Sequence, residues 1–216
     1  MKIWRVWFGL LATALLSGCG LVFDSSEPPA QAPVVANPPS TVEEPAPAPD
    51  PDPAPAQGAD VVEVDWPAVN HPQKMAESKI NQPAPEIAIQ EWVSAEASFE
   101  GKFVVVDFWA TWCGPCIRMI PHMNALNSKF ADQNITFLAL SDEPAAKVKK
   151  MTNPAIEYAS AVDQQGRLKS FFKPRGIPFV AIIDPAGRAC WQGHPAFLKE
   201  DTITKLLATY AEAAGS

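Results

Sequence analysis

Cysteine and histidine are both scarce in this chain of 216 residues, which contains four cysteines and three histidines. Cys113 and Cys116 form one Cys-x-x-Cys pair, whereas Cys19 and Cys190 stand apart from it. A structural zinc ion needs four ligands, which usually come from two paired motifs. Because the chain has a single pair and its histidines are scattered, we expect no bound metal ion, and a zinc site is the weaker alternative.

Basic side chains are in deficit as well. The chain carries 17 lysines and arginines against 24 acidic residues, for a net charge of −7. This balance argues against nucleic acid as a partner, since binding to phosphates needs a positive surface.

The sequence also lacks a long apolar run and an internal repeat. The apolar run Val6–Leu16 is too short to span a bilayer.

The first 18 residues have the order of an export signal. Lys2 and Arg5 come first, the apolar run Val6–Leu16 follows, and small residues precede Cys19. A charged start, an apolar centre and a small-residue end are typical of a segment that is removed during export. We therefore expect residues 1–18 to be a signal peptide that the mature protein lacks.

The four residues Leu16–Cys19 resemble the bacterial lipobox. That resemblance implies that Cys19 is lipidated, becomes the new N-terminus and contacts membrane lipid through several acyl chains, which stable anchoring requires. In Gram-negative lipoproteins the next residue helps to choose the membrane, and Gly20 in place of aspartate implies the outer membrane, with the protein facing the periplasm. An ordinary signal peptide followed by a chance cysteine is the alternative.

Proline is concentrated in one segment. Eleven of the 23 prolines lie between Pro28 and Gly58, among alanines and acidic residues. This composition cannot form an apolar core and favours extended chain, so we expect a disordered Pro/Ala-rich linker. The predicted organisation is a signal peptide (1–18), a lipid anchor and linker (19–60), an N-terminal extension (61–82) and one globular domain (83–213).

The globular part alternates between strand-like and helix-like patterns. The apolar run 103–108 predicts a strand that is covered on both faces. After Cys113 the apolar residues recur at spacings of three and four, which is typical of one face of a helix. The expected members of that face are Cys116, Met119, Met123, Leu126 and Phe130.

Further elements follow the same logic. The patterns predict a strand at 135–140, a helix at 144–151, a short strand at 157–161, a helix at 165–172, a hairpin of 179–183 and 188–192, and a last helix with Ile203, Leu206, Leu207 and Tyr210 on one face. Strands that alternate with helices indicate a parallel α/β core. The turn at 184–187 adds antiparallel strands to it.

The segment Val106–Cys116, VDFWATWCGPC, resembles the active-site segment of thioredoxin and of its TlpA/ResA-type extracytoplasmic relatives. Pro121 and Gly176–Pro178 also match, and the resemblance covers roughly 83–211. It implies an α/β, thioredoxin-like fold in which helices flank a central mixed β-sheet. We expect the chain to act as a monomer.

The resemblance implies catalytic roles for three residues. Cys113 would attack a partner's disulfide and Cys116 would resolve the mixed disulfide, so the redox-active Cys113–Cys116 pair serves without a further cofactor. The helix N-terminus, which Cys113 precedes, favours a thiolate. Asp107 matches thioredoxin's buried acid, which implies a raised pKa and a role with the Cys116 proton; a solvent-facing residue on an edge strand is the alternative.

The residues expected to bind a substrate protein are Trp112, Gly114, Pro115, Ile177 and Pro178. The family places Trp112 beside the reactive thiol as an apolar wall. Pro178 resembles the family's cis-proline, which leaves the backbone of Ile177 free to pair with an extended substrate segment. The alternative for Pro178 is a trans proline that starts a strand.

Three other side chains are interpreted as structural. Trp109 is expected to pack in the core. Cys190 is expected to be a small buried apolar residue, with a reactive free thiol as the alternative. His194 is expected to lie on the surface after a strand, outside the catalytic set.

The dipeptide Gly114-Pro115 is that of reducing thioredoxin, and Ile177 also matches the reductant type, which implies a protein-disulfide reductase. The resemblance further implies protein disulfide substrates, in cytochrome c maturation or related thiol reduction in the envelope, and a membrane thiol relay as electron donor. A thiol peroxidase is one alternative, although Ala110 occupies the position that its motif gives to Thr or Ser. A redox-inert binding lipoprotein is the other.

Overall fold

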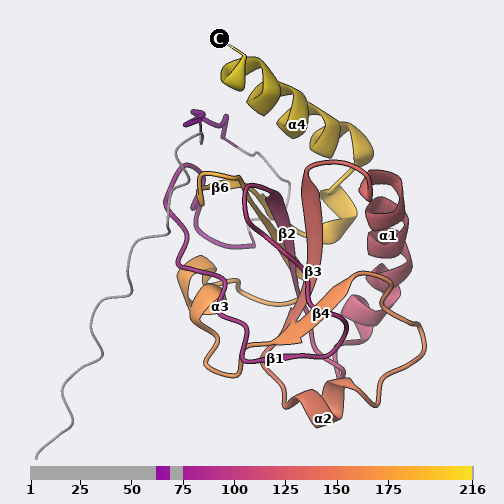
Figure 1. The fold of residues 1–216 in the computed structure, drawn as a ribbon. Helices are drawn as coiled ribbons and strands as arrows, with labels where there is room; N and C mark the ends of the chain where they lie inside the picture. Colours follow the sequence, from indigo (N-terminus) through magenta and orange to yellow (C-terminus); the bar gives the residue numbers. More distant parts are fainter. Residues whose placement is uncertain (1–61, 69–74, 216) are drawn as a thin grey trace, which may run out of the picture. The chain divides into compact units, whose positions relative to one another are not determined.

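The computed structural model describes residues 62–68 and 75–215. Their elements, shown in Figure 1, are β1 (Glu91–Trp92), β2 (Phe103–Phe108), α1 (Gly114–Phe130), β3 (Ile135–Ser141), α2 (Ala145–Val148), β4 (Ala159–Val162), α3 (Arg167–Phe172), β5 (Phe179–Ile183), β6 (Ala189–Gly193), a 3-10 turn (Pro195–Phe197) and α4 (Glu200–Ala214). The predicted signal peptide, Cys19 and the proline-rich segment lie outside these residues, so they stay predictions. No helix in the described ranges has the length and apolar character of a membrane span.

The strands form one six-stranded sheet in the order β1-β4-β3-β2-β5-β6. β2, β3 and β4 run parallel, whereas β1, β5 and β6 each pair antiparallel with a neighbour. The helix α1 connects β2 to β3, as a crossover between parallel strands requires. The predicted α/β class with a mixed central sheet is therefore confirmed.

β2 is an interior strand whose six residues are all buried, as its apolar run predicts. Side chains alternate between the two faces of a strand. Phe103 and Val105 belong to the core that also contains side chains of α1 and α4. Val104 and Val106 belong to the opposite core, which α3 covers (Figure 1). By the same alternation, Asp107 lies on the face that α1 covers.

The helix α1 begins where the periodicity predicts, but one member of its buried face differs. Its buried residues are Cys116, Ile120, Met123, Leu126 and Phe130. Met119, which we expected there, is only partly buried. Positions 119 and 120 lie three and four residues after Cys116, and both spacings return to the same face of a helix, so the spacing alone does not decide between Met119 and Ile120.

One further prediction needs correction, and one strand was not predicted. The helix expected at 144–151 has only four residues in α2, and the N–H groups of Lys150 and Met151 bond to carbonyl groups three residues back, so the helix ends in tight turns. The strand β1 was not predicted. It has only two residues, and pairing with Ala161 and Val162 of β4 defines it rather than any pattern of its own.

The described part of the N-terminal extension packs on the globular domain. Trp66 is 3% exposed, and its indole Nε1–H donates to Asp184 Oδ2 at 2.7 Å, in the turn between β5 and β6. Its ring also meets Phe103 of β2 edge to face, with 6.1 Å between the centroids. Residues on both sides of position 83 therefore share one core.

Candidate redox site

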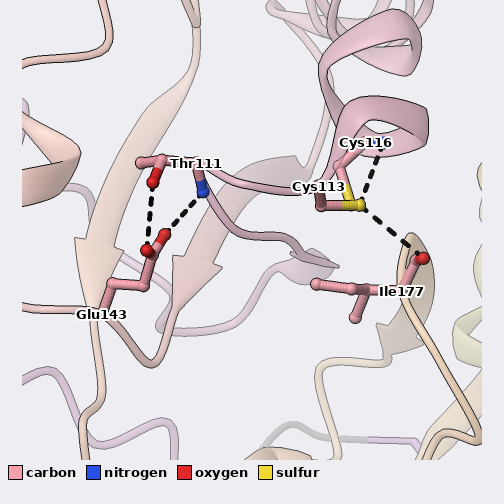
Figure 2. Close-up of a disulfide and its surroundings, with 5 residues drawn as sticks. All are labelled: Thr111, Cys113, Cys116, Glu143 and Ile177. Carbon is pink, nitrogen blue, oxygen red and sulfur yellow. Dashed lines mark hydrogen bonds between the residues drawn. A yellow bond between two sulfur atoms is a disulfide. The ribbon is translucent and has the colours of Figure 1, made fainter.

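Cys113 and Cys116 form a disulfide at the N-terminus of α1, with 5.2 Å between their Cα atoms (Figure 2). Cys113 is the N-cap residue, and Gly114 and Pro115 begin the first turn. Proline suits that turn because an N–H group there would have no partner within the helix. Since β2 ends at Phe108, the short loop that follows delivers the pair to the edge where the parallel strands β2 and β3 end.

Exposure does not distinguish the two cysteines, because each is 3% exposed. Hydrogen bonding does: the backbone N–H of Cys116 donates to Cys113 Sγ at 3.2 Å, and the first turn of α1 carries no acidic residue. Once the disulfide is reduced, this N–H group and the helix dipole favour a thiolate at Cys113. The carbonyl oxygen of Ile177 lies 3.7 Å from the same sulfur (Figure 2), where it can accept a hydrogen bond from a protonated thiol.

Asp107 lies inside the sheet, because β2 pairs with β3 on one side and β5 on the other. It is 4% exposed, and the Tyr158 hydroxyl donates to its Oδ2 at 2.8 Å. Burial raises the pKa of Asp107 to about 6, and the hydrogen bond from Tyr158 opposes part of that rise. A carboxyl group with such a pKa can exchange a proton near neutral pH. The structure therefore excludes the edge-strand alternative.

Glu143 was missed by the sequence analysis. Its carboxylate accepts hydrogen bonds from the backbone N–H of Thr111 at 2.5 Å and from the Thr111 hydroxyl at 3.0 Å (Figure 2), and it pairs with Lys147 Nζ at 2.5 Å. Burial raises the pKa of Glu143, but the hydrogen bonds from Lys147 and Thr111 outweigh burial and hold the pKa below its usual value. Glu143 thus fixes the loop in front of Cys113. The available signal was its place just after β3, at the edge that carries the disulfide.

The expected substrate-binding residues lie on both sides of the disulfide. Trp112 is 68% exposed and is the one large apolar side chain exposed among the described residues. Gly114 and Pro115, which follow Cys113, are also exposed. Ile177 is half-buried, Pro178 is buried, and a cis peptide bond joins them. The trans alternative for Pro178 is therefore wrong.

The three side chains interpreted as structural have structural surroundings. Trp109 is 3% exposed and belongs to the core. Cys190 is buried and its thiol donates to the carbonyl oxygen of Ile182 at 3.4 Å; burial, followed by the charge of Asp184, raises its pKa well above the ordinary value. His194 Nδ1 accepts a hydrogen bond from the N–H of Ala196, and partial burial lowers the pKa of its ring.

The chain matches one protein family and is similar to a set of named relatives. The model of the AhpC/TSA family matches residues 80–190. Thiol-disulfide oxidoreductase ResA of Bacillus thuringiensis subsp. konkukian is 32% identical over 92 residues, which are 42% of this chain and 53% of that relative. ResA of Geobacillus thermodenitrificans is 27% identical over 114 residues, which are 50% of this chain and 66% of that relative. The chain spans about half the length of the curated relatives it matches.

Two solved structures show the fold. A thiol-disulfide isomerase from Corynebacterium glutamicum has a TM-score of 0.50 and 21% identity, and the match covers 60% of this chain and 96% of the other. The thioredoxin domain of a thiol-disulfide oxidoreductase from Bacteroides vulgatus also has a TM-score of 0.50, with 20% identity, covering 59% of this chain and 97% of the other. The expected thioredoxin-like fold is therefore confirmed.

The family match and the site coincide in the sequence. The matched residues 80–190 contain the Cys113–Cys116 disulfide, the buried Asp107, the Glu143 that holds the preceding loop, and the cis Pro178. They make up about half of the chain. The chain belongs to the AhpC/TSA family.

Proposed function

We propose that this chain is a thiol-disulfide oxidoreductase that reduces protein disulfides through Cys113 and Cys116. The observation that carries the proposal is the disulfide at the N-terminus of α1, in which the Cys116 N–H group is directed at Cys113 Sγ. The relatives named thiol-disulfide oxidoreductase ResA support it. The pair is the redox group, and the reaction needs no further cofactor.

The first step is attack on the partner. In the reduced protein the Cys113 thiolate attacks one sulfur of a partner's disulfide, which forms a Cys113–partner disulfide and releases the other partner sulfur as a thiolate. The exposed Trp112 offers an apolar surface beside this sulfur. On the other side, the backbone of Ile177 is placed to pair with an extended segment of the partner.

The second step returns the pair to the disulfide seen in this structure. Asp107 takes the proton of the Cys116 thiol, and the resulting thiolate attacks Cys113 Sγ. The Cys113–Cys116 bond forms, the bond to the partner breaks, and the second partner sulfur leaves as a thiolate. Two electrons have then passed from the cysteine pair to the partner, which is reduced.

The proposal extends to location and partners. The mature protein is a lipoprotein anchored through acylated Cys19, on the periplasmic side of the outer membrane, and it acts as a monomer. Its substrates are oxidised proteins of the envelope, including those of cytochrome c maturation, and a membrane thiol relay returns electrons to the pair. The lipobox-like residues Leu16–Cys19 and the family resemblance are what support this part.

A thiol peroxidase is the second candidate, because the family model that matches is the AhpC/TSA family. Ala110 occupies the position where the peroxidase motif has a hydroxyl group. The neighbouring hydroxyl, that of Thr111, donates to Glu143 Oε1 at 3.0 Å, so it is not available to bind a peroxide. We therefore favour disulfide exchange.

Reduction of insulin disulfides by the purified protein, with dithiothreitol as electron source, tests the proposal. We expect wild-type protein to accelerate the reaction, Cys113→Ser to abolish the acceleration, and Cys116→Ala to accumulate a mixed disulfide through Cys113. Consumption of hydrogen peroxide at a comparable rate would instead support the peroxidase. Equal insulin reduction with and without the protein would support a redox-inert binding protein.

A further inference from the structure

We propose that Tyr158 is a positioning residue for Asp107: its hydroxyl group orients the buried carboxyl group and keeps it ionised, so that it can accept the proton of Cys116. This inference rests on the proposed function, in which Asp107 takes that proton. Tyr158 acts through Asp107 alone.

The contact between the two side chains is short and buried. The Tyr158 hydroxyl lies 2.8 Å from Asp107 Oδ2, and the residues are 6% and 4% exposed. The Tyr158 ring meets Phe137 of β3 edge to face at 6.3 Å between centroids, so packing fixes the hydroxyl. A neutral donor to a buried carboxylate stabilises the charged form without adding a charge of its own.

The rest of the surroundings of Asp107 do little to stabilise its charge. Its partners in the register of the sheet are Ala139 of β3 and Val180 of β5, both apolar and fully buried. The helix α1 contributes Cys116 to the same core. After β3, at this end of the sheet, Glu143 pairs with Lys147 and Asp142 pairs with Lys169, so each of these charges has a partner of opposite sign.

The segment that carries Tyr158 is fastened to the helix that carries the dithiol. Asn124 Nδ2 of α1 donates to the carbonyl oxygen of Ala155 at 2.9 Å, and Asn124 Oδ1 accepts from the N–H of Glu157 at 3.0 Å. Asn127 Nδ2 donates to the carbonyl oxygen of Glu157 at 3.1 Å. Asn124 and Asn127 are three residues apart and therefore lie on the same face of α1. The position of the hydroxyl thus depends on α1 itself.

The proton and electron balance of the step is simple. The Cys116 thiol gives its proton to the Asp107 carboxylate, its sulfur bonds to Cys113 Sγ, and the partner sulfur leaves with the electron pair of the broken bond. Tyr158 keeps its own proton throughout, and Asp107 later loses the proton it gained to solvent. No further oxidant or reductant takes part.

The first test uses carboxyl 13C NMR to measure the protonation of Asp107 as a function of pH. The full chain is kept oxidised, because no active-site thiol titrates in that state. Tyr158→Phe removes only the hydroxyl and keeps the ring in place. We expect the Asp107 midpoint to rise by on the order of one pH unit, since one hydrogen bond to a charged group is lost. The matched control is Tyr210→Phe, because the chain has two tyrosines and the Tyr210 hydroxyl instead contacts the N–H of Val62.

The second test is the pH profile of insulin reduction by the same proteins. The acid limb of the rate profile should move to higher pH in Tyr158→Phe, in the same direction as the NMR midpoint, and should stay in place in Tyr210→Phe. An unmoved NMR midpoint, or equal movement in Tyr210→Phe, would overturn the role of Tyr158, as would a moved midpoint with an unmoved rate profile. A wild-type protein without reductase activity would instead refute the proposed function, whatever the NMR shows.

Discussion

Two carboxyl groups near the dithiol have pKa values displaced in opposite directions, for different physical reasons. Asp107 accepts a hydrogen bond from Tyr158, but burial dominates and raises its pKa to about 6. Glu143 is also buried, yet hydrogen bonds from Lys147 and Thr111 lower its pKa on balance. Asp107 is therefore placed to exchange a proton near neutral pH, whereas Glu143 stays ionised and holds the loop.

Replacing Asp107 with Asn should stabilise the fold at neutral pH. The pKa of Asp107 in the folded protein, about 6, is above the ordinary value of 3.8. The protonated carboxyl group therefore stabilises the fold fully below about pH 4, and this stabilisation is lost as the pH rises through 6. A displacement of roughly two pKa units corresponds to about 3 kcal/mol. We expect Asp107→Asn to raise the free energy of unfolding in urea at pH 7 by about 1–3 kcal/mol.

The pH dependence separates this effect from a general change in packing. The gain should shrink toward zero at pH 4, where Asp107 is itself protonated. Asp132→Asn is the control, because Asp132 is exposed and its substitution should change stability by less than about 0.5 kcal/mol. An equal gain at pH 4 and pH 7 would contradict the buried, displaced carboxyl group.

At the level of elements, the loop between β2 and α1 depends on a contact with the turn that follows β3. Glu143 holds Thr111 there by two hydrogen bonds. We expect Glu143→Gln to lower the free energy of unfolding at pH 7 by about 1–3 kcal/mol, because a buried, charged hydrogen-bond network is broken. Since the pKa of Glu143 is lowered in the folded state, its stabilisation is present above the ordinary pKa and is lost as the pH falls through the folded value.

Urea unfolding at a series of pH values measures this effect, and the difference in free energy of unfolding from wild type should narrow as the pH falls below the ordinary pKa of 4.5. Glu91→Gln is the matched control, since Glu91 forms an exposed ion pair with Lys149, and exposed pairs contribute about 0–1 kcal/mol. If the two substitutions cost the same at pH 7, the buried contact with Thr111 does not stabilise the loop.

The elements that sequence patterns predicted best are those whose own residues define them. β2 has the bounds expected from its apolar run, which only Asp107 interrupts, and α1 begins after Cys113 as the change of period indicates. β1 has two residues and exists through its pairing with β4, so local pattern could not reveal it. The placement of Cys113, Cys116 and Asp107 follows from the well-predicted elements.

The contacts that complete the site were beyond reach of local patterns. Tyr158 meets Asp107 across 51 positions in the sequence, and Glu143 meets Thr111 across 32. Each pairing depends on how segments far apart in the sequence meet in the fold, which no periodicity encodes. Only the place of Glu143 after a parallel strand offered a hint.

On the scale of the whole molecule, the described N-terminal segment that contains Trp66 contributes to the stability of the fold. Trp66 packs against Phe103, and its indole N–H donates a hydrogen bond to Asp184. We expect Trp66→Ala to lower the free energy of unfolding by about 3–5 kcal/mol, since truncation of a core tryptophan removes a large buried area. Thermal or urea unfolding measures it.

Trp112→Ala is the comparison for Trp66, because it removes the same side chain from an exposed position. It should change the free energy of unfolding by less than about 0.5 kcal/mol while slowing the reduction of insulin. Similar losses of stability in the two variants would show that the N-terminal segment is not part of the core.

The measurement that tests the central claim most directly is the reduction potential of the Cys113–Cys116 pair, obtained by equilibrating the purified protein with defined thiol-disulfide buffers. We predict a reversible two-electron equilibrium near the value of thioredoxin, about −270 mV, that is lost in Cys113→Ser. A potential near that of strong oxidants, about −120 mV, would contradict the proposed direction and make the chain a disulfide donor. A pair that stays oxidised in the most reducing buffers would contradict a redox role altogether.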